Sequence, residues 1–308
     1  MNIDLAGQYL SGYRLSLSDG SNWWIAGYED TVPWVDELAA IMELEECKSN
    51  GSPRLIFSKL ADESDVEDGA KDAGHRVWGR HDLNDAGWVC YDDRLIRIWQ
   101  HDSISDVILE VRHNLNDTVK YVTMWTSLYP IYKRSMSGGG LPLHAGSAEL
   151  DGQGILVAAS GDTGKSTCCR RLPDYWNPLA DDEALVVLDT QKKHWLHPFP
   201  TWSDYLWERA ENTWNVQYSV SLSGIFFLEQ SETDEVVPLG TGEAAVLISE
   251  SATQVCQKFW RRADIEDQRR FRSDIFSNAC EMAKRVPVYR LRASLHGRFW
   301  EEIENVLT

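Results

Sequence analysis

One short segment of the chain has the residue types and the spacing of a phosphate-binding loop. Residues 159–166 read ASGDTGKS, and the pattern G-x-x-x-x-G-K-[ST] fits them at every position except the first, where Ala159 replaces glycine. The apolar segment ILVA at 155–158 precedes the loop, and a helix is expected at 165–172. Backbone N–H groups of such a loop cradle the phosphates of a nucleotide. The segment therefore predicts a binding site for ATP or GTP.

The loop residues would divide between binding the phosphates and binding a metal ion. Lys165 would neutralise the β- and γ-phosphates, and the hydroxyl of Ser166 would ligate Mg²⁺. The alternative is a glycine-rich turn with a chance Lys-Ser pair, and the flanking strand and helix argue against it. The residues expected to bind the nucleotide are Ser160, Gly161, Asp162, Thr163, Gly164, Lys165, Ser166 and Thr167.

Two adjacent carboxylates, Asp181 and Asp182, could complete this site. They lie at the beginning of an apolar segment that predicts a strand over 179–188. Because neighbouring residues of a strand point to opposite faces, one carboxylate could bind the metal while the other accepts the proton of a hydroxyl group. The alternative is that both residues only cap the strand. His144 is a further candidate, although a single histidine is more often structural than catalytic.

Strands and helices alternate in the second half of the chain, which is the pattern of an α/β domain. Residues 197–204 hold two prolines and two aromatic residues, and they predict a stiff loop that either binds substrate or only packs. The expected strands are 155–158, 179–188, 223–228 and 286–291, and the expected helices are 165–172, 243–261, 264–285 and 299–306.

The first part of the chain predicts a smaller, β-rich α+β domain. An Asp-Gly step at 19–20 lies between two alternating apolar segments and indicates a β-hairpin. Three glycines at 138–140 favour a boundary nearby, and we assign 1–125 to the first domain and 126–308 to the phosphate-loop domain. Further strands are expected at 55–57, 76–78, 87–90, 95–99 and 107–111, and helices at 35–44 and 118–136.

The composition excludes several classes of partner. Asp and Glu number 48 against 30 Lys and Arg, which gives a net charge of −18 at pH 7. Because an acidic chain repels nucleic acid, we expect no nucleic-acid partner. No apolar segment approaches the roughly 18 residues of a membrane-spanning helix, and no signal peptide is evident, so we expect no membrane contact. The six cysteines form no C-x-x-C pair, and their spacing is that of neither a disulfide framework nor a zinc site. We therefore expect a cytoplasmic location.

Several of these segments together resemble the HPr kinase/phosphorylase family. They are LHA at 143–145, GQG at 152–154, ILV at 155–157, GKS at 164–166 and LADD at 179–182. The resemblance covers roughly residues 140–245. It implies a phosphate-loop domain with a mixed sheet like that of the HPr kinases and PEP carboxykinases.

The resemblance also implies roles for single residues. Asp181 would be the general base toward a seryl hydroxyl, Asp182 would lie on the metal side, and His144 would lie near the acceptor. An arginine that the family carries near its active-site flap is replaced by Pro238, so HPr itself is not the expected acceptor and the reverse reaction is not expected. A replacement could come from the basic cluster of Arg261, Arg262, Arg269, Arg270 and Arg272, and the second metal-binding acid could be Asp204 or Glu208.

A second set of segments resembles the ScmC family of the SynChlorMet cassette, a set of genes for a modified peptide. The segments are GSNWW at 20–24, CCRRLP at 168–173, LADDE at 179–183, HPFPTW at 197–202 and GIFFLEQ at 224–230. This resemblance implies a role in peptide tailoring.

We therefore expect an ATP-dependent kinase that phosphorylates a hydroxyl, on Ser or Thr of a peptide or small protein, with Mg²⁺ as its metal. Trp202, Trp207 and Trp214 could line a groove for the acceptor, and the N-terminal domain could recognise the peptide by adding a strand. Two alternatives stay open: a nucleotide-binding scaffold of a peptide-modifying assembly without kinase activity, and a kinase that acts on a small metabolite. The chain could also form homo-oligomers.

Overall fold

The structure is a computed structural model, and it describes most of the chain. The described residues are 12–48, 53–60, 87–92, 95–112, 116–159, 163–207, 212–260 and 265–307. They form two units, each with its own mixed sheet and its own helices, so the α/β class is confirmed. The expected strand at 76–78 lies outside the described residues.

The first unit takes in the described residues of 1–16, 21–130 and 205–210. Its sheet has the strand order β3-β1-β2-β4-β7-β6-β5, with two parallel pairs, β2 with β4 and β4 with β7. The Asp-Gly hairpin is confirmed, because β1 and β2 pair antiparallel around Gly20, whose φ is 84°. The strands are β1 (Gly12–Ser16), β2 (Asn22–Gly27), β3 (Glu45–Cys47), β4 (Arg54–Lys59), β5 (Trp88–Asp92), β6 (Ile96–His101) and β7 (Ile104–Val111).

The helices of this region differ from the expectation in two places. The segment 118–136, expected as one helix, forms α2 (Asp117–Ser127) and α3 (Tyr129–Ser137). Pro130 explains the break, since a proline lacks the N–H of a helical hydrogen bond and disfavours helical geometry in the residue before it. The expected helix at 35–44 is α1 (Val32–Ile41), and it begins earlier because Pro33 is tolerated in a first helical turn. A short 3-10 helix, η1 (Glu29–Thr31), precedes α1.

The second unit takes in the described residues of 17–20, 131–204 and 211–308. Its main strand order is β11-β9-β10-β14-β13-β12-β8, with β16 beside β14 and β15 beside β16. β10 and β16 run parallel to β14 on either side of it. The strands are β8 (Leu141–Leu143), β9 (Ala145–Leu150), β10 (Gln153–Ala158), β11 (Asn177–Ala180), β12 (Glu183–Leu188), β13 (His194–Phe199), β14 (Val220–Gln230), β15 (Glu235–Pro238) and β16 (Val288–Ala293).

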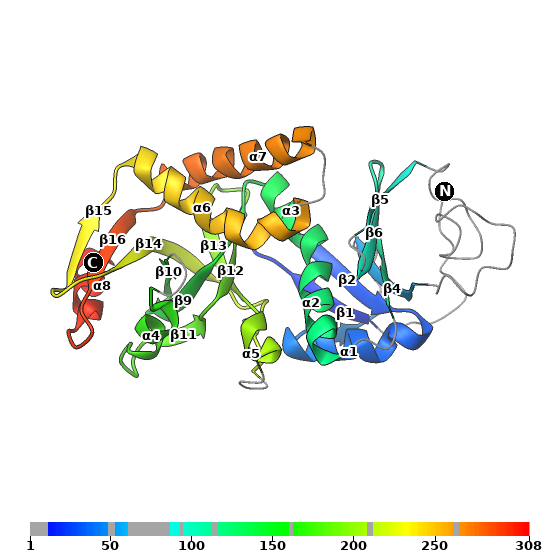
Figure 1. Ribbon diagram of the computed structural model, residues 1–308, viewed down its shortest axis with the longest axis horizontal. Coiled ribbons are helices and arrows are strands. Elements are labelled where there is room, and N and C mark those ends of the chain that lie inside the picture. Colours follow the sequence, from blue (N-terminus) through cyan, green and yellow to red (C-terminus); the bar gives the residue numbers. More distant parts are fainter. Residues whose placement is uncertain are drawn as a thin grey trace, which may run out of the picture. The chain divides into compact units, whose positions relative to one another are not determined.

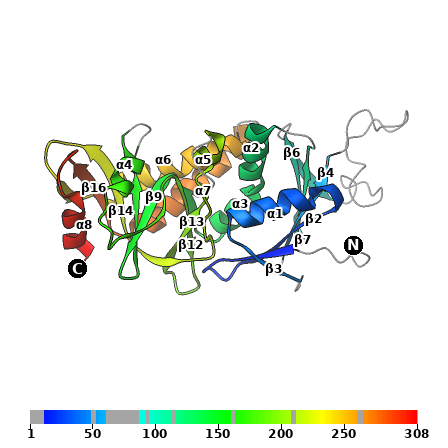
Figure 2. The same ribbon diagram turned by 90° about the horizontal axis from the view of Figure 1, so that it is seen from below.

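Helices cover both faces of this second sheet (Figures 1 and 2). On one face lie α6 (Thr241–Trp260) and α7 (Ile265–Ala283), and on the other lie α4 (Lys165–Arg170) and α8 (Phe299–Leu307). The face under α4 and α8 holds a buried apolar cluster of Ala148, Ile155, Val157, Cys168, Trp176, Phe226, Leu291, Phe299 and Ile303. On the opposite face, the ring of Tyr132 from α3 packs against Phe199 and Phe259, with centroids 5.5 and 6.0 Å apart. No helix among the described residues is long and apolar enough to cross a membrane.

Two expectations for the second unit are wrong. The segment 179–188 is not one strand, because the chain leaves β11 after Ala180 and enters β12 at Glu183. β11 pairs with β9, whereas β12 pairs with β13 and β8, so Asp181 and Asp182 form the turn between two separate pairings. The segment 197–204 is not a loop either, since its first part belongs to β13 and its last part to α5 (Trp202–Leu206).

Candidate functional site

The phosphate-loop segment occupies the carboxyl end of a central parallel strand. β10 ends at Ala158, and α4 begins at Lys165. Gly164 has φ of 98°, a conformation that residues with a side chain rarely adopt, and it leads directly into the helix. The side-chain amide of Gln230, at the end of β14, donates a hydrogen bond to the Thr163 carbonyl over 3.2 Å and ties this end of the loop to the sheet. Ser160, Gly161 and Asp162 lie outside the described residues.

Lys165, His144 and Asp182 form a continuous polar chain. The Nζ atom of Lys165 contacts Nε2 of His144, and the His144 Nδ1 atom lies 3.2 Å from Oδ1 of Asp182. Lys165 is 9% exposed, so its charge is held inside the site. The His144 backbone is fixed by Ser251 of α6, whose carbonyl accepts from the His144 N–H over 3.4 Å and whose hydroxyl donates to the His144 carbonyl over 3.2 Å.

Burial lowers the pKa values of the two basic groups among these three side chains. It lowers the pKa of His144, and the charge of Lys165 lowers it further, while Asp182 opposes the shift. Burial also lowers the pKa of Lys165, against the pull of Asp182, Cys169 and Asp181. A neutral imidazole can accept a hydrogen bond from the Lys165 ammonium at Nε2 and donate from Nδ1 toward Asp182. His144 thus lies between Lys165 and Asp182 and contacts one of them with each ring nitrogen.

Asp181 points into different surroundings from its neighbour. Its Oδ1 atom accepts a hydrogen bond of 2.8 Å from the hydroxyl of Thr201, in the connection between β13 and α5. Gly146 of β9 allows α4 to approach this turn, since a Cβ there would lie 2.4 Å from the Cys169 sulfur and 3.6 Å from the Asp181 Cα. The two carboxylates are therefore separated, with Asp182 toward Lys165 and His144 and Asp181 toward Thr201.

Comparison with known families bears on this site. The family model of the SynChlorMet cassette protein ScmC matches residues 107–308. The chain belongs to the ScmC family. The match begins within β7 and includes every site residue described above, so the ScmC resemblance is confirmed over this range. No curated protein matches the chain.

This ScmC-family chain also has a buried polar cluster behind Asp182 that the motifs did not indicate. Glu183, which is 3% exposed, accepts a hydrogen bond from the hydroxyl of Tyr132. Burial and the Glu183 charge raise the pKa of Tyr132, and burial lowers the pKa of Lys258 of α6 despite the opposing charge of Glu183. The signal available in the sequence was a single acid at the head of the otherwise apolar segment 183–188.

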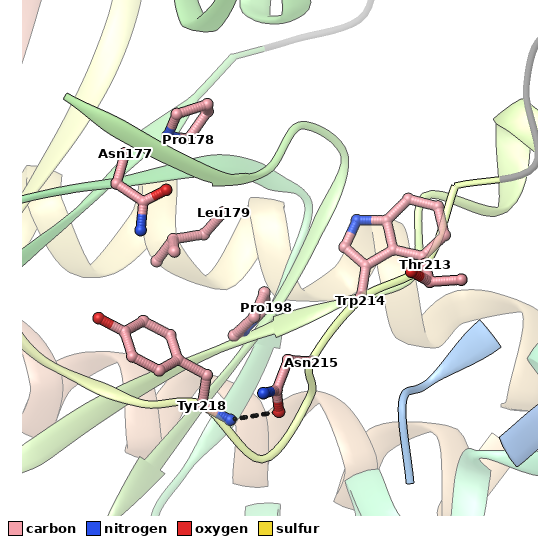
Figure 3. A pocket seen from close by; sticks show the side chains of 8 residues that line it. All are labelled: Asn177, Pro178, Leu179, Pro198, Thr213, Trp214, Asn215 and Tyr218. Carbon is pink, nitrogen blue, oxygen red and sulfur yellow. Dashed lines mark hydrogen bonds between the residues drawn. The ribbon is translucent and has the colours of Figure 1, made fainter. Parts of the chain in front are cut away.

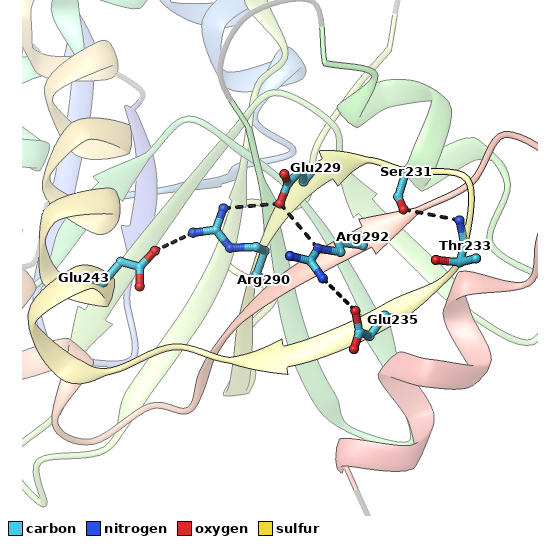
Figure 4. Close-up of polar contacts among 7 residues, drawn as sticks. All are labelled: Glu229, Ser231, Thr233, Glu235, Glu243, Arg290 and Arg292. Carbon is cyan, nitrogen blue, oxygen red and sulfur yellow. Dashed lines mark hydrogen bonds and ion pairs between the residues drawn. The ribbon is translucent and has the colours of Figure 1, made fainter.

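Two arginines on the strand beside Pro238 in this ScmC-family chain are paired with carboxylates. Pro238 ends β15, and the antiparallel pairing with β16 places Arg290 and Arg292 beside this strand. The Nη1 atom of Arg290 lies 3.2 Å from Oε2 of Glu229 (Figure 4). The carboxylates that neutralise the two arginines are Glu229, Glu235 and Glu243. The sequence offered the basic cluster at 261–272 as a source of this arginine and did not indicate Arg290 or Arg292.

Several other residues predicted for the site do not belong to the polar group of Lys165, His144 and Asp182. Asp204 accepts a hydrogen bond of 2.9 Å from the side-chain amide of Asn212. Trp202 is 1% exposed and belongs to the core, whereas Trp207 is 70% exposed. Glu208, Arg261 and Arg262 lie outside the described residues, and Arg269, Arg270 and Arg272 are exposed on α7. Within the part of the chain that the structure describes, no group of three or more His, Cys, Asp or Glu is placed to hold a metal ion.

Proposed function

We propose that this ScmC-family protein is an ATP-dependent kinase that phosphorylates a Ser or Thr hydroxyl of a peptide or small protein. The observation that carries the proposal is the pair of diverging carboxylates beside a buried lysine. Lys165 begins the helix that follows the phosphate-loop segment, and Asp182 reaches it through His144, while Asp181 is held separately by Thr201. A phosphotransferase needs this division between a group that manages phosphate charge and a base for the acceptor.

The residues present have the chemistry that Mg·ATP requires. The Ser166 hydroxyl and the Asp182 carboxylate supply oxygen ligands of the kind that Mg²⁺ prefers, and phosphates and water would complete its shell. When bound, the ion would neutralise charge on the β- and γ-phosphates. Lys165 would exchange its contact with His144 for a phosphate oxygen, and His144 would keep its place through Ser251.

The transfer step then follows from the position of Asp181. Its carboxylate accepts the proton of the acceptor hydroxyl, and Thr201 fixes the orientation of the carboxylate by its hydrogen bond. The acceptor oxygen forms a bond to the γ-phosphorus as the bond from this phosphorus to the bridging oxygen of ADP breaks. Lys165 stabilises the charge on the transferring group.

A scaffold that binds nucleotide without transferring phosphate is the second candidate. It is favoured by one observation, that Pro238 stands where the HPr kinase family has an arginine and that the neighbouring Arg290 and Arg292 are paired with carboxylates. Such a protein would bind ATP at the same loop and would leave Asp181 without a chemical role.

Asp181→Asn separates the two functions. In a kinase, this variant should lose phosphoryl transfer by roughly 100-fold or more, the scale of a lost general base, and keep its affinity for Mg·ATP. Transfer would be measured with γ-labelled ATP and a library of peptides with a central Ser or Thr, and binding by the thermal shift with Mg·ATP. Asp274→Asn, at an exposed position of α7, is the matched control and should change neither quantity.

The opposite results are equally clear. Nucleotide binding by the wild type without transfer to any peptide or small-molecule fraction would overturn the kinase and favour the scaffold. Transfer that survives in Asp181→Asn at the wild-type rate would remove Asp181 from the role of base.

A further inference from the structure

A pocket lies where β11, the end of β13 and the segment before β14 meet (Figure 3). Its volume is about 310 Å³. Leu179 and Pro198 form part of its wall, and Trp214 and Tyr218 contribute aromatic rings. The side-chain amides of Asn177 and Asn215 and the hydroxyl of Thr213 supply polar groups, and none of the lining residues that the structure describes is charged. This pocket is separate from the residues that would hold the nucleotide.

The walls of the pocket are fixed in place. Trp214 is 6% exposed, so its ring forms part of the wall and is not a side chain free in solvent. The hydroxyl of Tyr218 donates to Glu149, and the Tyr218 N–H donates to the Asn215 side-chain oxygen over 3.1 Å (Figure 3). Because the rings are held before anything binds, little conformational entropy would be lost when a ligand enters.

Two walls of the pocket continue directly into the surroundings of Asp181. Leu179 precedes Asp181 by two residues at the end of β11, so the two Cα atoms lie within about 7 Å of one another even in an extended chain. Pro198 lies near the end of β13, and the same segment continues to Thr201, the hydrogen-bond donor to Asp181. Leu179 and Pro198 therefore lie two and three residues along the chain from Asp181 and Thr201, respectively.

The size and lining of the pocket select one class of group. Its volume is at the lower end of the range of about 300–1,000 Å³ for ligand sites, which suits one large side chain better than a nucleotide. Rings, prolines and a leucine favour an apolar body, and the described lining residues offer no charged partner to an ion that would lose its hydration there.

We propose that this pocket binds a neutral aromatic or large aliphatic side chain, one or two residues from the phosphorylated Ser or Thr of a peptide substrate. The proposal rests on the proposed kinase function, since it places the acceptor hydroxyl at Asp181. It adds a substrate class, because peptides with Trp, Tyr, Phe or Leu beside the acceptor would be preferred over peptides with Asp or Lys there.

The test uses the full chain, Mg²⁺, γ-labelled ATP and peptides with a central Ser or Thr and each amino acid in turn at the two positions on either side. Wild type should prefer an aromatic or large aliphatic residue at one of these positions by roughly 10- to 200-fold in kcat/KM over glycine, the range of one apolar contact. Trp214→Ala should lose this preference.

Two further variants distinguish a loss of the pocket from a loss of folding. Tyr218→Ala changes a residue that is 38% exposed, so it is better tolerated by the fold, and it should also reduce the preference. Trp207→Ala is the matched control, because Trp207 is 70% exposed and does not line the pocket, and it should keep the preference. The thermal shift with Mg·ATP should be the same in all four proteins.

The outcomes separate this proposal from the kinase itself. Phosphorylation without any preference at the flanking positions, or with a preference that persists in both Trp214→Ala and Tyr218→Ala, overturns the pocket and leaves the kinase in place. Nucleotide binding without phosphorylation of any peptide overturns the peptide kinase, and the pocket proposal falls with it.

Discussion

At the scale of single residues, the contacts of both ring nitrogens of His197 require the neutral imidazole. Its Nδ1 atom lies 2.9 Å from the carbonyl of Val216 and must donate, and its Nε2 atom accepts from the backbone N–H of Ser18 over 3.1 Å. A proton on Nε2 would place two donors against one another. Burial, more than any other factor, lowers the pKa of this fully buried side chain to about 4.

This pKa predicts a loss of stability in mild acid. Because the folded pKa is about 4 and the unfolded pKa is about 6.5, the contribution of His197 is complete above pH 6.5 and is lost as the pH falls toward 4. Between pH 7 and pH 5 the loss should be about 2 kcal/mol. Urea unfolding at both pH values should therefore show a smaller pH dependence in His197→Gln than in wild type.

His296→Gln is the control for this measurement, because His296 is exposed. It should keep the wild-type pH dependence. An equal pH dependence in His197→Gln and wild type would show that His197 does not titrate as its contacts require.

At the scale of elements, β14 is an interior strand of the sheet of the second unit. It is paired with three other strands, and Phe226 in its middle is fully buried, with its ring stacked on Tyr289 at 5.1 Å. On the neighbouring strand β16, Arg292 forms an exposed ion pair with Glu235 at 2.8 Å. The Phe226 ring is buried, whereas the side chains of Arg292 and Glu235 are largely exposed.

Burial therefore predicts very different effects of substitution. Phe226→Ala should lower the free energy of unfolding by about 3–5 kcal/mol, because it removes a buried ring and leaves a cavity. Arg292→Gln should change it by less than about 1 kcal/mol, because an exposed ion pair is screened by water. Chemical unfolding followed by circular dichroism would measure both, and a loss at Arg292 as large as that at Phe226 would contradict the argument.

At the scale of the whole molecule, ligand binding and folding are coupled. Mg·ATP that binds only the folded chain adds about 2.7 kcal/mol at 100 times its Kd, which is about 4 °C in Tm for a chain of this length. Wild type should show this shift, and Lys165→Ala should lose it. Lys284→Ala, at an exposed lysine of the second unit, should keep it.

A shift that persists in Lys165→Ala would mean that nucleotide binds elsewhere. The absence of a shift in wild type at millimolar Mg·ATP would contradict an ATP site in this chain. The net charge of −18 makes Mg²⁺ alone a necessary control, since the ion could bind acidic surface groups without nucleotide.

Features that depend on neighbouring residues could be predicted from the sequence. Alternation around Asp19-Gly20 fixed the β1–β2 hairpin, and helical periodicity located α6, α7 and α8 to within a few residues. The strand before the phosphate loop and the helix after it were also predictable, because apolar runs and glycines act locally. Pro130 is a local signal for the division between α2 and α3.

Features that depend on pairing between distant segments could not be predicted in this way. The turn at Asp181 and Asp182 exists because β11 and β12 pair with different strands, and apolar content alone does not state which strands pair. The contacts of His144 with Lys165, of Tyr132 with Glu183 and of Ser18 with His197 likewise join separate segments. Local spacing fixes which way a side chain points from its own strand or helix. What it meets there is set by packing between elements, because that packing decides which buried polar groups find partners.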